Sequence, residues 1–372
     1  MQEECFFELI QLSIGCRQQL SRMPSVEEWD AVYQMAQKQA LVGICFVGIT
    51  KLRDAGLKLP QQLYYEWLAM TAQIQERNQQ LNAYIPKVTE LFRSYGFPCY
   101  VLKGQSIGKL YGELAEFRQS GDIDVWTVGG RRKICSLSMS LFGKIEGLTY
   151  HHIHFPYLND VEIEAHFKPG YLNSPRHNRC LEKIFALYEP SLASVSDDAP
   201  TSFNLIYILL HCYMHFLERG VGLRQLMDYY FVILSISHNV RDEKETVNNL
   251  KNTGLLKFAR AVMWVLMAVF GMEEQYAICK PDKHEGQFLL KEILQTGNFG
   301  HQDPRYNWRL SSPIRRFWAN QVWNFHLLIH YPEEILWSPF AAIYRYAAIK
   351  QWSKRPFASD KWDELQQLNT EL

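Results

Sequence analysis

The hydrophobic pattern changes near residues 96–98, Gly-Phe-Pro, and this change constrains the fold of the 372-residue chain more than any other feature. Residues 1–95 carry apolar side chains at three- and four-residue spacing, which predicts helices. From 96 to 190, short apolar runs bounded by turn residues alternate with helix-like segments, which predicts a small α/β unit. From 200 to 372 the apolar faces are again helical. We therefore expect an α+β chain with an α/β core between an N-terminal and a C-terminal helical region.

Two local signals place helix starts in the N-terminal region. Ser25 is followed by Glu27 and Glu28, which predicts a helix start with acids in its first turn. Proline is tolerated in the first turn of a helix, so we expect Pro60 to open another one.

The C-terminal part combines polar, aromatic and basic segments. We expect the segment 280–313 to be irregular, and Pro332 and Pro339 to interrupt any long helix in the tail. Aromatic side chains at helical spacing favour a place in the core, with a membrane surface or stacked bases as the alternatives. The residues concerned are Arg315, Arg316, Trp318, Trp323, Trp337, Tyr344, Arg345, Tyr346 and Trp352.

The charge balance and the cysteine content limit the kind of partner and the cellular compartment that we expect. The 39 basic and 39 acidic residues balance, which disfavours a long nucleic acid as the main partner. The eight cysteines are scattered without a Cys-x-x-Cys pair, as in reduced cytosolic proteins. The N-terminus has acids where an export signal needs lysine or arginine. The longest apolar run, 261–272, is too short to span a bilayer. We therefore expect a cytoplasmic protein without a transmembrane segment.

Two carboxylates lie one residue apart in the predicted strand that contains Asp122 and Asp124. Side chains alternate along a strand, so both point to the same face, where like charges repel. A divalent cation resolves that conflict, because carboxylate oxygens are ligands that Mg²⁺ prefers. A third carboxylate is expected from the later strand, where Glu162 and Glu164 again share one face. Either of these two glutamates can complete the site.

The residues before the two aspartates suit phosphate binding. Gly104 permits a tight turn between a predicted strand and a predicted helix, and a helix N-terminus favours an anion. Lys103 and Arg118 supply positive charges for a triphosphate.

The order of these residues resembles the nucleotidyltransferase superfamily that includes DNA polymerase β. Within it, the chain is similar to an uncharacterised bacterial nucleotidyltransferase-like family. The matching residues are Leu102-Lys103-Gly104, Tyr111, Arg118, the run from Ser120 to Asp124, and Glu164-Ala165-His166. Segments 220–230 and 294–300 also look like parts of that family, so the resemblance covers about residues 85–300.

The resemblance implies a small mixed-sheet, polymerase β-like core that transfers a nucleoside monophosphate from an NTP such as ATP. It implies Mg²⁺, with Mn²⁺ as the alternative ion, in a two-metal site formed by Asp122, Asp124 and Glu164. It further implies that the nucleotide is bound by a second set of residues, in which Ser106 takes the place of the family's usual serine. That set is Lys103, Gly104, Ser106, Arg118, Ser120 and Gly121.

The acceptor is open between a small molecule, a sugar and a protein side chain. One alternative is a nucleotide-binding or regulatory protein that keeps the fold but has little catalysis. Another is a toxin–antitoxin-type or protein-modifying enzyme that adds AMP.

Two histidine groups offer further chemistry. His152 and His154 share a strand face and suggest zinc, but the sequence shows no third ligand at useful spacing, which favours a structural role or the edge of a cleft. His211 and His215 share a helix face, and the next helix carries an i, i+4 pair of charged residues, Arg224 and Asp228. These four residues form either a buried polar network between two helices or a cleft-lining contact to nucleotide or acceptor.

Overall fold

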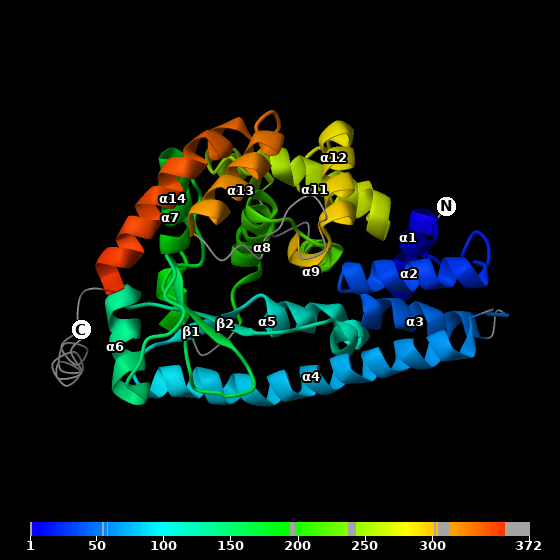
Figure 1. Ribbon diagram of the computed structural model, residues 1–372, viewed down its shortest axis with the longest axis horizontal. Coiled ribbons are helices and arrows are strands. Elements are labelled where there is room, and N and C mark those ends of the chain that lie inside the picture. Colours follow the sequence, from blue (N-terminus) through cyan, green and yellow to red (C-terminus); the bar gives the residue numbers. More distant parts are fainter. Residues whose placement is uncertain are drawn as a thin grey trace. The chain divides into compact units, whose positions relative to one another are not determined.

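The computed structural model describes residues 2–53, 56–57, 59–193, 198–236, 243–300, 303 and 313–353, which Figure 1 colours along the chain. The packing divides the chain into two compact units. The helical unit comprises Met1–Gln79, Ile107–Ser120 and Asn204–Tyr331. The sheet unit comprises Gln80–Ser106, Gly121–Phe203 and Pro332–Leu372. The three sequential domains at 1–95, 96–190 and 200–372 stay a prediction.

The helical unit is built from α-helices joined by short 3₁₀ turns. Its helices are α1 (Gln2–Ser13), α2 (Val26–Lys38), α3 (Val42–Leu52), the first part of α4 (Gln61–Ser94), most of α8 (Thr201–Glu218), α9 (Leu223–Leu234), α10 (Glu243–Asn252), α11 (Leu256–Phe270), α12 (Lys283–Thr296) and α13 (Pro313–Leu327). Its 3₁₀ segments are η2 (Lys109–Phe117), η4 (Glu274–Tyr276) and η5 (Asn298–Gly300).

The predicted helix start at Ser25 is confirmed. The Ser25 side chain accepts a hydrogen bond from the backbone N–H of Glu28, and the Glu28 carboxylate accepts one from the backbone N–H of Ser25 at 2.8 Å. This reciprocal pair satisfies two N–H groups that the first turn leaves without helical partners. Pro60 immediately precedes α4, and its carbonyl accepts from the N–H of Tyr64, so the helix opens there as expected.

The expectation of an irregular segment at 280–313 is wrong for its first half. Helix α12 occupies Lys283–Thr296, with the Asp282 side chain accepting the N–H of Glu285 at 3.2 Å. Its buried face alternates apolar residues such as Leu289 with polar ones such as Glu292, and this mixture hid the helical period. Residues 304–312 lie outside the described residues.

The predicted interruption of the tail is confirmed at Pro332, which begins a new helix after α13 ends at Leu327, and is wrong at Pro339. Helix α14 runs without interruption over Pro332–Ser353. Pro332 is the first residue of the helix, where an N–H has no helical partner in any case. Pro339 lies inside α14, where one proline removes one backbone hydrogen bond.

The aromatic residues of the tail do not all lie in the core. Trp323 is fully buried, as expected, and Trp352 packs against the hydrophobic core of the sheet unit. The core expectation is wrong for four other side chains, which are exposed: Trp318, Trp337, Tyr344 and Tyr346.

The sheet unit contains four strands: β1 (Cys99–Leu102), β2 (Ile123–Thr127), β3 (His152–His154) and β4 (Ile163–His166). Their order is β1-β2-β4-β3. Strands β2 and β4 pair in parallel, whereas β1 pairs with β2 and β3 with β4 in antiparallel fashion. The sheet is therefore mixed, and the predicted α+β fold class is confirmed. The unit also holds α6 (Gly130–Phe142), α7 (Pro175–Ala186), η3 (Glu189–Ala193) and α14.

The segment between β1 and β2 departs from the single helix that the sequence favours. It divides into a short α5 (Gly104–Gly108) and η2, which is kinked at Gly112. Gly112 has φ +57° and ψ −125°, a conformation that a residue with a side chain rarely adopts.

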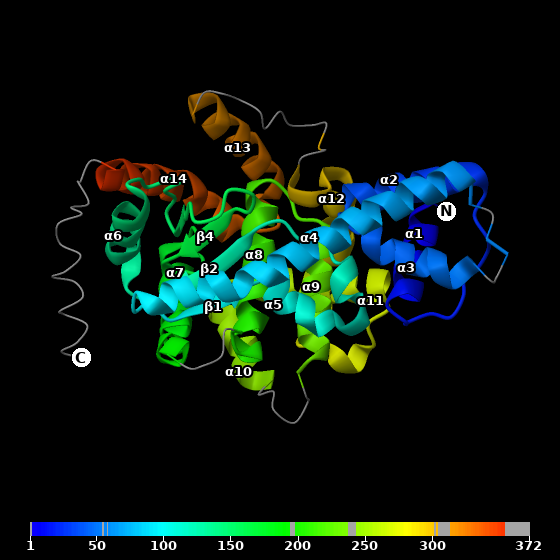
Figure 2. The same ribbon diagram turned by 90° about the horizontal axis from the view of Figure 1, so that it is seen from below.

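One face of the sheet is apolar, and the other carries the polar residues of β2, β3 and β4 beside buried aromatic side chains of β1 and β2. Residues such as Val101, Val125 and Ile153 share a hydrophobic core with Phe92 of α4 and Ile134 of α6. Figure 2 shows the second half of α4 running across β1 and β2. The polar residues of the same strands must then lie on the opposite face. No helix in the described part of the chain is both long and apolar enough to cross a bilayer.

Candidate active site

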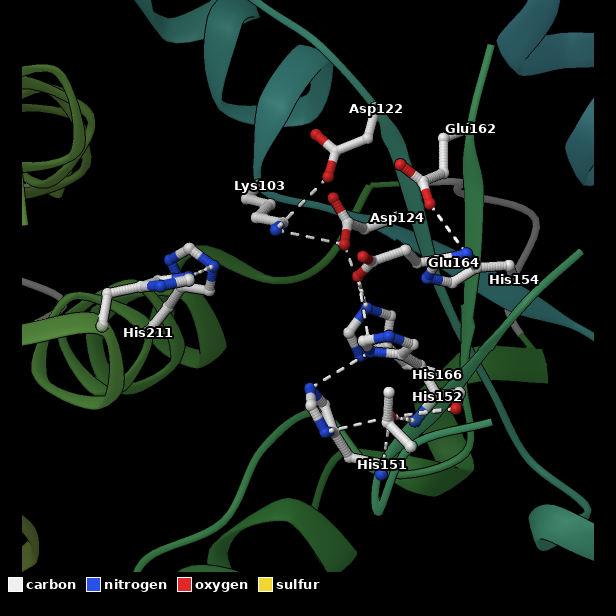
Figure 3. Close-up of polar contacts among 12 residues, drawn as sticks. Lys103, Asp122, Asp124, His151, His152, His154, Glu162, Glu164, His166 and His211 are labelled. Carbon is white, nitrogen blue, oxygen red and sulfur yellow. Dashed lines mark hydrogen bonds and ion pairs between the residues drawn. The ribbon is translucent and has the colours of Figure 1, made fainter. Parts of the chain in front are cut away.

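Three strands bring their polar side chains together on one face of the sheet. Asp124 of β2 is the direct partner of Glu164 of β4, and Glu164 is the direct partner of His154 of β3. His166 and His152 oppose each other in the same way, two residues away along β4 and β3, and so lie on the same face. Directly opposed residues lie on the same side of a sheet. The five side chains therefore converge, as Figure 3 shows.

His166 joins the two carboxylates of neighbouring strands. Its Nε2 lies 3.0 Å from Asp124 Oδ1 and 3.2 Å from Glu164 Oε2. Burial opposes a charge on this ring, but the hydrogen bonds to Asp124 and Glu164 outweigh it and raise the pKa of His166 to about 9. Burial likewise opposes charge on Glu164, yet the bond to His166 and the nearby charge of Lys103 lower the pKa of Glu164 to about 2. A protonated His166 therefore lies against the ionised carboxylate of Glu164.

Asp124 has one oxygen that nothing in the described protein satisfies. The residue is 1% exposed, and its Oδ2 is buried without a hydrogen-bond partner. A buried carboxylate oxygen without a donor is costly unless a cation or a donor reaches it. Asp124, Glu164 and His166 each offer one ligand atom, and these atoms lie within 4.8 Å of one another. The residues present thus fit a divalent cation.

Lys103 brings a positive charge to the same carboxylates. Its Nζ lies 3.2 Å from Asp124 Oδ1 and 3.9 Å from Asp122 Oδ2. The sharp turn out of β1 that positions it has φ +34° at Lys103 and +49° at Gly104. The buried Ser106 donates its backbone N–H to the Lys103 carbonyl at 3.1 Å, which closes this turn. Lys103 is therefore held between the two aspartates that the sequence singled out.

Asp122 lies just outside the strand. The sequence predicts that Asp122 and Asp124 share a strand face, but β2 begins at Ile123 and the Asp122 side chain is 41% exposed. Among the described residues, Asp122 belongs to no group of three metal-ligand atoms within 4.8 Å of one another. Its metal-binding role stays a prediction.

Glu162 and Glu164 have different neighbours, and which of them is the third metal ligand stays a prediction. Glu164 lies beside Asp124 in register and contacts His166. Glu162 precedes β4, and its Oε1 lies 2.8 Å from Nδ1 of His154. Only Glu164 therefore joins the carboxylate of β2.

The histidines of β3 extend this cluster. His152 Nδ1 lies 3.4 Å from Glu164 Oε2 and 3.2 Å from Nε2 of His151. Burial, followed by the charge on His166, lowers the pKa of His152 to about 3, so its ring is neutral. The sequence showed no third ligand for His152 and His154, but the fold brings Glu164 to them.

Arg118 occupies a buried ion pair in the helical unit. Its Nε and Nη2 donate to the two carboxylate oxygens of Asp228 at 2.6 and 2.7 Å, and Nη1 donates to Ser120 Oγ at 2.7 Å. The Tyr111 hydroxyl also donates to Asp228, at 2.7 Å. Such a bidentate pair compensates for the burial of both charges. The nitrogens of Arg118 thus bind protein groups. The predicted contact of Arg118 with phosphate stays a prediction.

The predicted network between the helix of His211 and His215 and the helix of Arg224 and Asp228 stays a prediction, since Asp228 links α9 to the end of η2 through Arg118. The other members make different contacts. Arg224 donates to the Gln119 carbonyl at 3.2 Å, and the Nε2 atoms of His211 and His215 lie 3.0 Å apart. A contact of these residues to nucleotide or acceptor stays a prediction.

The sequence singled out His166, Tyr111 and Asp228 but did not predict the contacts that they make. His166 was visible as the last residue of Glu-x-His, where strand alternation places it on the face of Glu164. Tyr111 and Asp228 lie 117 residues apart in the chain, and no local pattern links them.

The fold and the site define a class. A mixed four-stranded sheet with neighbouring carboxylates on two parallel strands and a lysine at the end of β1 is an α+β nucleotidyltransferase-like core. The model of a family described as uncharacterised nucleotidyltransferase matches residues 25–271 of the chain. The chain belongs to this family. The match takes in α2 and α3, which lie before the segment that carries the resemblance, and leaves out 294–300. No curated protein and no solved structure matches the chain.

Proposed function

We propose that the protein is a metal-dependent nucleotidyltransferase that moves a nucleoside monophosphate from an NTP to an acceptor. The observation that carries the proposal is the pairing of Asp124 with Glu164 on parallel strands, with Asp124 Oδ2 buried and without a hydrogen-bond partner in the described part of the chain. His166 compensates part of the repulsion between the two carboxylates, but the buried oxygen of Asp124 still needs a donor or a cation.

Asp124 and Glu164 would hold Mg²⁺ or Mn²⁺, and Asp122 would contribute from the entrance of β2. When bound, such ions stabilise charge on the phosphoryl oxygens and lower the pKa of the acceptor group. Asp122 is the most exposed of the three carboxylates, which suits a metal ligand on the side from which the substrate enters.

Lys103 would bind phosphate oxygens. Its ammonium group lies against Asp124 and Asp122, so it is positioned where a triphosphate and its ions would collect. The turn through Gly104 and Ser106 fixes this position. Positioning and charge neutralisation of this kind supply most of the catalysis in phosphoryl transfer.

His166 and Arg118 would act as positioning residues. His166 holds the carboxylates of Asp124 and Glu164 in fixed orientations, as hydrogen-bonded groups behind metal ligands do. Arg118 donates a hydrogen bond to Ser120, which precedes Gly121 in the chain, and would thereby fix the backbone at Ser120. Ser120 and Gly121 would contact the nucleotide by the family resemblance.

We propose the acceptor only by class: it is a small molecule, a sugar or a protein side chain in the cytoplasm. Incubation with labelled ATP separates these classes, because an enzyme that adds AMP to proteins labels itself or a protein partner. A regulatory protein with little catalysis would bind NTP and transfer no label.

Calorimetry with each NTP, in the presence and absence of Mg²⁺, tests the proposal. We expect at least one NTP to bind only with the metal, and Asp124→Asn and Glu164→Gln each to weaken this binding. Glu146→Gln is the matched control, since Glu146 is an exposed carboxylate of the sheet unit that pairs with Lys144. If the wild type binds no NTP with metal present, the proposal loses its support.

A further inference from the structure

Two histidines beside the carboxylates, His152 and His154, have no part in the function proposed above. His152 and His154 alternate in β3 and therefore share the polar face of the sheet. Glu164 is the register partner of His154. One ligand atom from each of these three residues lies within 4.8 Å of the others.

The spacing of the ligand atoms suits a transition-metal ion. His152 Nδ1 and Glu164 Oε2 lie 3.4 Å apart. Two ligands of a tetrahedral ion with bonds of about 2.0–2.1 Å are separated by about 3.3–3.4 Å. The pair therefore already has the separation that such an ion requires.

The imidazole of His154 is oriented by a neighbouring carboxylate and a neighbouring glycine. Its Nδ1 lies 2.8 Å from Glu162 Oε1, which leaves Nε2 as the nitrogen for a ligand. Histidines that bind metals almost always donate their other ring N–H to a carboxylate or a carbonyl in this way. Gly147 lies against the same ring, and a Cβ at this position would overlap His154. Glu162 and Gly147 thus fix the imidazole in place.

The type of donor separates this group from the magnesium ligands. Imidazole nitrogens suit zinc and related first-row ions, whereas Mg²⁺ prefers oxygen. Two histidines and one glutamate form the ligand set of zinc sites that keep a fourth position open. The His154 side chain is 39% exposed, so an ion can reach it from solvent.

We propose that His152, His154 and Glu164 form a transition-metal site that shares Glu164 with the magnesium site. The inference uses no nucleotide chemistry and does not depend on the proposed reaction. The competing interpretation is a hydrogen-bonded cluster that binds no ion.

The test uses the full chain, freed of metal by chelation, without nucleotide. Zn²⁺ is titrated by calorimetry, and Co²⁺ is added to detect the visible absorption of a four-coordinate ion. We expect one Zn²⁺ per chain, retained in a large excess of Mg²⁺. We expect His154→Gln to abolish the tight binding. Glu162→Gln should weaken it by about 10–100-fold, the usual effect of losing a group behind a ligand.

Gly147→Ala keeps every ligand atom but displaces the His154 ring, so it should also weaken Zn²⁺ binding. His151→Gln is the matched control, because His151 contacts His152 from outside the proposed ligand set. Circular dichroism and melting temperature show that each variant is folded.

Three results would overturn the inference: a wild type that binds no Zn²⁺, a folded His154→Gln that binds it as tightly as the wild type, or a larger loss in His151→Gln than in His154→Gln. The first result in a protein that still binds NTP with Mg²⁺ removes this inference alone. Zn²⁺ binding without any NTP binding removes the proposed function alone.

Discussion

Asp124 and Glu164 stand directly opposite each other on the parallel strands β2 and β4. His166 bridges them, and Lys103 contacts Asp124 from the end of β1. The two carboxylates thus lie against the protein's own cations, and Asp124 Oδ2 has no hydrogen-bond partner among the described residues. The first two predictions follow from these buried charges.

Mg²⁺ should stabilise the wild type against heat, because an ion that binds the folded carboxylates does not bind the unfolded chain equally well. At a concentration of 100 times Kd the stabilisation is about 2.7 kcal/mol. Asp124→Asn should remove this Mg²⁺-dependent rise in melting temperature, measured by calorimetry in matched buffers. Glu146→Gln should keep it. A rise of equal size in Asp124→Asn would place the ion elsewhere.

The stability of the metal-free protein should fall with rising pH. The pKa of His166 is raised in the folded state from its ordinary value of 6.5 to about 9. The stabilisation is therefore fully present below about pH 6.5 and is lost as the pH rises through about 9. Urea unfolding from pH 6 to 10 measures the slope, and His166→Gln should flatten it. An equal slope in that variant would assign the effect to other groups.

Removing one partner of the buried Arg118–Asp228 pair should destabilise the protein by about 3–5 kcal/mol, because the other charge is left buried alone. Arg118→Lys should also destabilise it, since lysine cannot donate to both oxygens of Asp228. Urea denaturation of Arg118→Leu and Asp228→Leu measures the loss. The exposed pair of Lys144 and Glu146 is the control, and its disruption should change little.

If Arg118 served phosphate binding alone, Arg118→Lys would leave the unfolding curve unchanged and would lower only NTP affinity. The two measurements together therefore separate a structural role from a ligand role.

A fourth prediction concerns the contact between α3 and η2. A Cβ on Gly43 would overlap the Phe117 carbonyl oxygen. Gly43→Ala should therefore cost about 1–3 kcal/mol, as overpacking in a core does. Gly108→Ala is the matched control, because Gly108 has helical φ and ψ and its added Cβ would meet only the Arg118 side chain at 3.9 Å. Thermal unfolding of both variants checks the difference, and equal melting temperatures would contradict the close approach.

Local signals predicted the elements that depend on local chemistry. Glycines and alternation marked β1 and β2, and the serine–glutamate pair marked the start of α2. Prediction failed where tertiary packing decided the outcome. The buried face of α12 carries Glu285 and Glu292, whose His330 and His326 partners lie far along the chain. A polar face of this kind looks like a loop until those partners are known.

The candidate site could also be predicted only where it depends on local sequence. Its carboxylates could be found because strand alternation is a local rule, and their resemblance to a family added the expected chemistry. The partners of Arg118 and the ligand set around His154 could not be found, since both depend on which strands and helices become neighbours.

The parallel pairing of β2 with β4 also ties the site to the order of folding. Asp124 and Glu164 meet only after the chain from 128 to 162 has crossed over and β4 has docked beside β2. Parallel pairs between distant segments form slowly, because loop closure must precede their contacts. A register shift by one residue would turn Glu164 toward the apolar face and separate the two carboxylates. Metal affinity during refolding would therefore report the moment at which the central strands reach their native register.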